Sequence, residues 1–161
     1  MYAQKEKSYI WDVIITCVVL GGCGLILIPM WKREKAEMME TDLHSGLGLI
    51  RAQLPLYNKQ HDNRWPGENI ANQMTELTSL EGFTWSELLE GDERPPSYPF
   101  GPYFNGAFPA NPYDEKNSVT IVDVMPGEPT DDGGWIYCPT TGEFRANLTG
   151  LDSWGNRLFD F

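Results

Sequence analysis

A long apolar run near the start of the chain limits what this sequence can fold into more than any other feature. Residues 10–31 read IWDVIITCVVLGGCGLILIPMW and carry one charged side chain, that of Asp12. As a helix the run is about 33 Å long, enough to cross the hydrocarbon core of a bilayer. A cleaved signal peptide would have a shorter apolar region and then small residues, whereas Met-Trp-Lys-Arg follows here at 30–33. The run therefore predicts a retained membrane helix.

The helical pattern continues beyond this run as a single apolar stripe. Apolar residues recur every three or four positions, at Ala36, Met39, Leu43, Leu47, Ile50, Leu54 and Tyr57. The opposite face carries charged residues, namely Lys35, Glu40, Asp42, Arg51 and Lys59. We expect one helix from about Tyr9 to about Asn58, with a kink at Pro29 and a last turn weakened by Pro55. Its second half must lie against another layer of the fold.

The remainder of the chain predicts that second layer. Residues 69–80 have the apolar spacing of a short helix, and residues 81–112 are rich in Pro, Gly and aromatic residues, which is typical of a long ordered loop. Residues 118–125, 135–138 and 143–147 read as strands, the last two joined by a turn at 139–142, and 157–161 is a candidate fourth strand. The expected fold class is α+β, with a long helix packed on a small antiparallel sheet.

Charge and motifs exclude several classes of function. The chain has 161 residues and a net charge of −11, and residues 32–161 contain 10 Lys and Arg against 21 Asp and Glu. Such a body repels phosphate backbones, so we expect no nucleic-acid partner. The three cysteines form neither a disulfide framework nor a zinc motif. His44 and His61 lack a catalytic context, and we expect His44 to be solvated or at an interface and His61 to be exposed in the loop after the helix. The sequence therefore predicts a protein that is not an enzyme.

Several short motifs, in a fixed order, resemble those of type IV pilin-like proteins. A charged leader at residues 1–7 precedes the apolar helix, an acid (Asp12) lies early in that helix, and Pro29 follows it by 17 residues. The amphipathic part ends in LIRAQLPLYNKQHDNRWP at 49–66, and the GPY and GWIY segments at 101–103 and 134–137 follow later. The chain is most similar in this order to the pseudopilins of type II secretion systems, major pseudopilins in particular.

This resemblance implies a pilin-like fold and a role in a filament. It implies a leader at 1–7, a membrane or filament-core helix at 8–31 and an extracytoplasmic domain at 32–161, held in the bacterial inner membrane with that domain in the periplasm. The implied partners are other pilin-like subunits, the inner-membrane secretion platform and membrane lipid. Asp12 and Pro29 would set the register of assembly, and Leu43, Leu47, Ile50, Leu54 and Tyr57 would pack the helix on its own domain.

The processing site departs from the family pattern. By its spacing from Asp12, the bond that the family's prepilin peptidase cuts corresponds to Lys7-Ser8, where the family has glycine before the cut. Without cleavage there would be no methylated amine at Ser8. Two functions therefore stay open. One is a structural pseudopilin subunit that supports protein secretion, and the other is an uncleaved single-pass anchor that displays a pilin-like binding domain.

The resemblance also raises the question of a metal. Major pseudopilins bind calcium in a loop near the C-terminus, and calcium prefers six to eight oxygen ligands. Asp131 and Asp132 could supply two of them, with Asp123, Asp114 or Asp152 nearby after folding. The alternative is an exposed acidic turn, in which Asp and Gly are the expected residues. No other cofactor is expected.

Mass spectrometry of the membrane-extracted protein tests the processing site. The peptidase's need for glycine is explained by close approach of the backbone, which a lysine side chain obstructs. We therefore expect an intact N-terminus that still carries residues 1–7. A mature, methylated N-terminus at Ser8 would contradict this prediction and restore the family's usual route.

Overall fold

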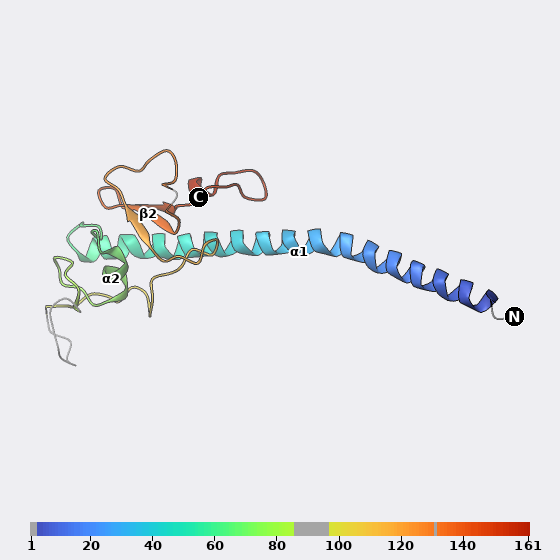
Figure 1. Ribbon diagram of the computed structural model, residues 1–161. Coiled ribbons are helices and arrows are strands. Elements are labelled where there is room, and N and C mark those ends of the chain that lie inside the picture. Colours follow the sequence, from blue (N-terminus) through green and yellow to red (C-terminus); the bar gives the residue numbers. More distant parts are fainter. Residues whose placement is uncertain (1–2, 86–96, 131) are drawn as a thin grey trace. The chain divides into compact units, whose positions relative to one another are not determined.

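The computed structural model describes residues 3–85, 97–130 and 132–161 (Figure 1). Within the first helix, the side chains of residues 3–11, 13, 14, 19–30 and 32 lie outside this description. The chain divides into two compact units, Met1–Met38 and Met39–Phe161. Helix α1 spans Ala3–Gln60 and so contributes to both units.

The long helix is confirmed. The expected range of about Tyr9 to Asn58 falls within α1, and this helix continues through Pro29 and Pro55. Among the residues that the structure describes, no helix has both the length and the apolar character that a bilayer crossing requires. Most side chains of the predicted membrane segment, residues 8–31, lie outside the described residues, so the membrane helix remains a prediction.

The second unit contains a three-stranded mixed sheet, which corrects the expected antiparallel one. Strands β1 (Val119–Ile121), β2 (Trp135–Cys138) and β3 (Glu143–Ala146) lie in the order β1-β2-β3. The predicted hairpin is confirmed, because β2 and β3 pair antiparallel. However, β1 pairs parallel to β2. The segment 122–134 joins these two strands, and it is long enough for the crossover that a parallel pair needs.

Two further elements differ from the expectation. The candidate fourth strand at 157–161 is a 3-10 helix instead, η2 (Leu158–Asp160), with Leu158 and Phe159 buried. The expected helix at 69–80 is shorter, because α2 ends at Thr75 (Ile70–Thr75). Beyond it the chain turns extended, and the backbone N–H of Thr78 donates to the carbonyl oxygen of Phe100 at 3.0 Å.

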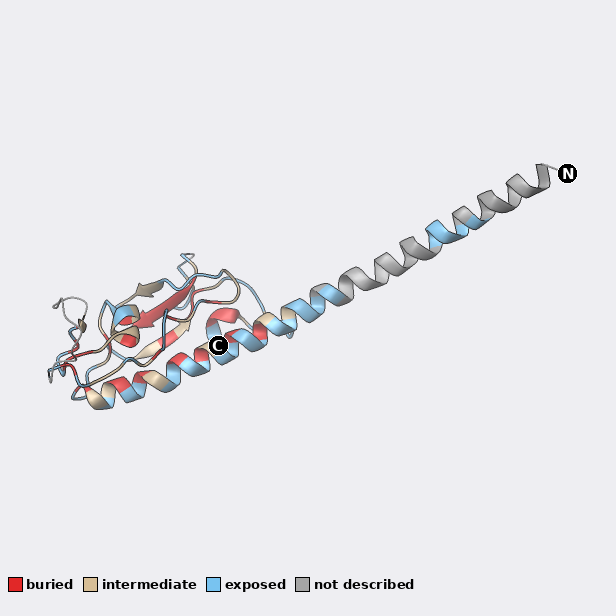
Figure 2. Ribbon diagram, turned by 90° about the horizontal axis from the view of Figure 1, so that it is seen from below, coloured by how far each residue is buried: buried red, intermediate tan, exposed pale blue. Residues whose placement is uncertain are grey.

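The predicted apolar stripe of α1 forms one wall of the core. Its members in the second unit are buried: Leu43, Leu47, Ile50, Leu54 and Tyr57. They share one hydrophobic cluster with Trp135, Tyr137 and Phe144 of the sheet. In Figure 2 the buried positions of this part of α1 lie on the side that carries the sheet, whereas exposed positions line its other side.

Aromatic residues of the long loop close the core on another side. Phe104 and Phe108 are buried and meet edge to face, with ring centroids 5.6 Å apart. The indole N–H of Trp135 donates to the carbonyl oxygen of Pro109 at 2.8 Å, which fixes the loop to β2. The prediction that this Pro/Gly-rich loop packs on the domain is therefore confirmed for residues 97–112.

Two leucines of α1 offer a matched test of this core. Leu47 is 1% exposed and Leu49 is 50% exposed. Leu47→Asp removes a packed side chain and buries an unpaired charge, so we expect it to lower the free energy of unfolding by about 4 kcal/mol or more. Leu49→Asp should change it by no more than about 1 kcal/mol. Urea unfolding followed by tryptophan fluorescence measures both, and equal losses would contradict this packing.

Candidate functional site

The side of α1 that faces away from the sheet is also apolar in part. Leu49 and Leu56 are 50% and 44% exposed, and Ala52 between them is exposed too. Spacings of three, four and seven residues place all three on one side of a helix. We call this set the outer face. Sequence reasoning missed it because only the charged residues of this side were considered, although the seven-residue spacing of the leucines was visible.

Glu40 was expected on the charged, solvated side of the helix, and this is wrong. Its side chain is buried, with 4% of the residue exposed. One carboxylate oxygen accepts the backbone N–H of Ser153 at 2.6 Å, and the other accepts the Ser153 hydroxyl at 2.9 Å. Hydrogen bonds to a charged acceptor are among the stronger ones in proteins. Glu40 therefore ties the segment around Ser153 to α1.

Arg51 likewise connects the helix to the sheet. Its guanidinium donates two hydrogen bonds to the carbonyl oxygen of Phe144, at 2.9 and 2.7 Å, and another to the carbonyl oxygen of Phe161. Burial, and then the positive charge of Arg145, lower the pKa of Arg51, while Glu143 opposes them. Arg51 therefore attaches α1 both to strand β3 and to the last residue of the chain.

The candidate calcium ligands do not gather among the described residues. Asp131 lies outside the description. Asp123 is exposed, and Asp132 accepts a hydrogen bond from the hydroxyl of Thr130 at 2.9 Å within its own turn. No group of three or more acidic, His or Cys side chains is placed to hold a metal in the described part of the chain. Calcium has no part in the function proposed below.

Asp152 serves a turn instead. One of its carboxylate oxygens accepts the backbone N–H groups of Trp154 and Asn156, at 2.9 and 2.7 Å, and the other accepts the side-chain amide of Asn156 at 2.8 Å. Desolvation acts to raise the pKa of Asp152, but the hydrogen bonds from Asn156 and the following backbone outweigh it and lower the pKa. The tight-turn interpretation of this segment is confirmed.

His61 was expected to be exposed, and the structure corrects this. It is fully buried, and its ring stacks on that of Tyr57 with centroids 3.7 Å apart. Its Nδ1 lies 2.8 Å from the carbonyl oxygen of Tyr57, so Nδ1 carries the proton and donates. Its Nε2 lies 3.0 Å from the hydroxyl of Thr78 and accepts from it in the neutral ring. His44, in contrast, is exposed and stacks on Phe161.

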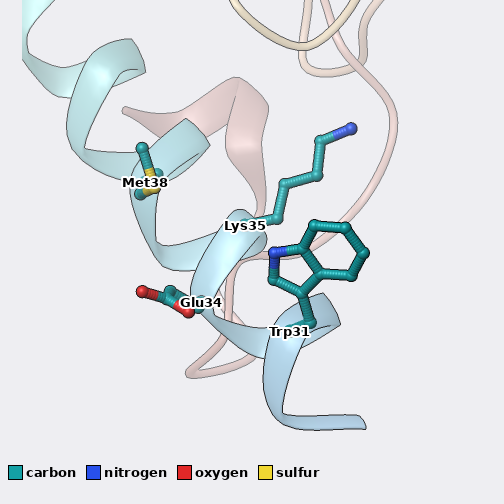
Figure 3. A pocket seen from close by; sticks show the side chains of 4 residues that line it. All are labelled: Trp31, Glu34, Lys35 and Met38. Carbon is teal, nitrogen blue, oxygen red and sulfur yellow. The ribbon is translucent and has the colours of Figure 1, made fainter. Parts of the chain in front are cut away.

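The first unit contains the remaining predicted residues. Asp12 is exposed on α1, and its backbone carbonyl accepts the hydroxyl of Thr16 at 2.7 Å. The side chains of Lys7, Ser8 and Pro29 lie outside the described residues. A shallow groove farther along the helix is lined by Trp31, Glu34, Lys35 and Met38. Figure 3 shows Trp31 and Lys35 on one flank of the helix and Glu34 and Met38 on the other.

Comparison of the chain with family models, with curated proteins and with solved structures finds no match. The function proposed below therefore depends on the sequence resemblance and on the geometry of the described residues.

Burial of His61 predicts a pH-dependent stability. Burial, its largest influence, lowers the pKa of His61 from the usual 6.5, although the bond to the Tyr57 carbonyl opposes this. The unfolded chain then binds a proton that the folded chain does not, so stability is fully present above about pH 6.5 and is lost as the pH falls below it. Urea unfolding between about pH 8 and about pH 5 should show this loss. The free energy of unfolding should fall less steeply with falling pH in His61→Gln than in the wild type. An equal dependence on pH in the two proteins would contradict the prediction.

Proposed function

We propose that this chain is a structural pseudopilin subunit of a type II secretion or type IV pilus-like filament that supports protein secretion. It acts by assembly and not by catalysis. Residues 8–31 hold it in the bacterial inner membrane with the rest of the chain in the periplasm. Its partners are further pilin-like subunits, the secretion platform of the inner membrane and membrane lipid.

The outer face of α1 is the observation that carries this proposal. A helix that only packs on its own domain needs one apolar side, and the buried stripe already supplies it. Leu49 and Leu56 are a second apolar side, and Ala52 between them lets another helix approach closely. Covering the two leucines contributes roughly 1 kcal/mol each at the usual value per unit of apolar area. Such a face is suited to helix-to-helix contact between subunits.

Sequence features at the start of the chain support the membrane part. The uncharged residues from Val13 to Met30 are followed by Trp31 and then by Lys32, Arg33 and Lys35. Tryptophan and basic residues are enriched where a membrane helix reaches the lipid headgroups. Trp31 is exposed, and it lies on the same flank of the helix as Lys35 (Figure 3).

One alternative has an observation in its favour. Lys7 stands where the family has glycine, so an uncleaved chain would remain a single-pass anchor. It would then display its second unit at the membrane surface as a binding domain. This alternative differs from the filament subunit in one measurable property, because it does not require association between copies.

Self-association of the full-length protein in detergent distinguishes the filament subunit from the anchored binding domain. Leu49→Ser with Leu56→Ser removes the apolar side chains of the outer face without touching the buried stripe. We expect the double variant to associate about thirtyfold more weakly than the wild type, because about 2 kcal/mol of burial is lost.

The matched control is Val124→Ser, which removes an apolar side chain that is 79% exposed and does not belong to α1. Sedimentation equilibrium measures all three proteins, and circular dichroism verifies their folding. A wild type that stays monomeric at every concentration would overturn the filament subunit in favour of the anchored binding domain.

A further inference from the structure

A closed loop near the end of the chain is held together by its own hydrogen bonds. Leu151 pairs with Arg157 as a short antiparallel bridge, and the backbone N–H of Asp152 donates to the carbonyl of Asn156 at 2.8 Å. Inside the loop, the carboxylate of Asp152 accepts the backbone N–H groups of two later residues. We call residues 151–157 the Trp154 loop.

The loop is also fixed from outside. Ser153 donates both its backbone N–H and its hydroxyl to the buried carboxylate of Glu40. Arg157 donates to the carbonyl of Gly127 at 2.9 Å and forms an ion pair with Glu128 at 2.7 Å. The backbone that carries Trp154 is therefore positioned before any partner arrives, which reduces the entropy lost on binding.

The loop presents its tryptophan to solvent. Trp154 is 78% exposed, and Leu151 beside it is exposed as well. Tryptophan is among the residues that most often dominate a protein interface, because its large rigid side chain buries much area at small entropic cost. A firmly held loop with an uncovered indole at its tip has the form of an anchor that inserts into a partner.

The same unit contains a groove that fits such an anchor. It encloses about 310 Å³ between α1 and the turn that joins β2 to β3. Leu54 and Phe144 are buried beneath it, and Pro55 and Trp65 are more open to solvent. The indole of Trp65 lies against Gly142, where any added Cβ would come within 2.6 Å of it. The turn therefore has no room for a side chain at position 142.

We propose that Trp154 of one copy docks in this groove of a second copy. The inference rests on the proposed function, since it requires copies of the chain to associate. Trp154 cannot fill the groove of its own chain. Its loop is fixed at Glu40, whereas the groove lies at Leu54, about 21 Å farther along α1 at 1.5 Å per residue.

The positions of anchor and groove determine the kind of assembly. They are two different surfaces of one molecule, so the contact is head to tail, and a pair of copies keeps one free anchor and one free groove. Contacts of this type close into rings or continue as open helical filaments. The anchor and the groove lie at different points along α1. Docking therefore shifts each copy along the helix relative to the one before it, as in a filament.

Charge supports a second copy as the occupant. The Trp154 loop carries the ionised Asp152, while its Arg157 is paired with Glu128, and Arg51 is among the residues that line the groove. Glu143, which also borders the groove, is paired with Arg145 at 2.5 Å. The incoming loop therefore meets a guanidinium next to a neutralised carboxylate. A guanidinium beside the groove also suits the face of an incoming indole.

Photocrosslinking in the full-length protein tests the contact directly. Trp154→p-benzoylphenylalanine keeps an aromatic side chain at the tip of the loop and makes it photoreactive. A mixture of ¹⁵N-labelled and unlabelled chains then identifies crosslinks between copies by mass spectrometry. We expect such crosslinks to join the probe to peptides that contain Pro55 or Trp65.

The matched control is Val124→p-benzoylphenylalanine, since Val124 is 79% exposed and belongs to the same unit. It should give no crosslink to the groove. Trp154→Ala should weaken self-association about tenfold or more, as loss of an interface anchor does. Glu40→Gln keeps Trp154 but weakens the attachment of its loop, so we expect a smaller loss from it. Trp154 is exposed, so its replacement leaves the fold in place.

The outcomes separate this inference from the proposed function. A wild type that associates, with Trp154→Ala equal to it and no crosslink in the groove, would overturn the docking while the filament subunit stands. A wild type that does not associate would overturn both. Crosslinks from position 154 to the groove within one and the same chain would also overturn the docking between copies.

Discussion

Packing of the α1 stripe on strand β2 is the interaction on which the second unit depends. All four residues of β2 are buried, and Trp135 and Tyr137 share one cluster with Leu43, Leu47 and Ile50 of the helix. A sheet with strands of three or four residues cannot bury enough apolar area by itself, so it needs a helix as its second layer. The side chains of β2 thus determine where the sheet lies on α1. They also hold the long loop, through the bond from Trp135 to Pro109.

The features of the fold that are local or periodic could be predicted from the sequence. Apolar residues every three or four positions identified the buried stripe of α1, because burial on one side of a helix leaves that period. The hairpin of β2 and β3 was likewise visible as two short strands around a Pro-Thr-Thr-Gly turn. The direction of β1 could not be predicted, because the alternation of apolar and polar residues in 118–125 is the same for a parallel and an antiparallel strand. Only the length of segment 122–134 carried that information.

The errors at polar residues have one cause in common. Glu40 lies at the edge of the apolar stripe, and its burial depends on Ser153, which is 113 residues away in the sequence. His61 is buried because Tyr57, one turn earlier, and Thr78, beyond α2, both reach its ring. Such partners leave no periodic signal, because each supplies a single hydrogen bond from a distant segment. The outer face and Trp154 are similar: the sequence shows the residues, and only the fold shows that they stay exposed.

One helix therefore links the interior of the unit to the surfaces that we assign to assembly. Its buried side holds the sheet, its edge holds the Trp154 loop through Glu40, and its outer face carries Leu49 and Leu56. Because the loop is attached to this helix at Glu40 and the groove is lined by Leu54 of the same helix, the rise of the helix separates the two attachment points. The acidic surface opposes contact between copies, but this repulsion is screened beyond about 8 Å at physiological salt, whereas apolar contacts act at van der Waals distance. We therefore expect short-range apolar contacts at fixed positions to be the means by which an acidic chain of this kind associates in one register.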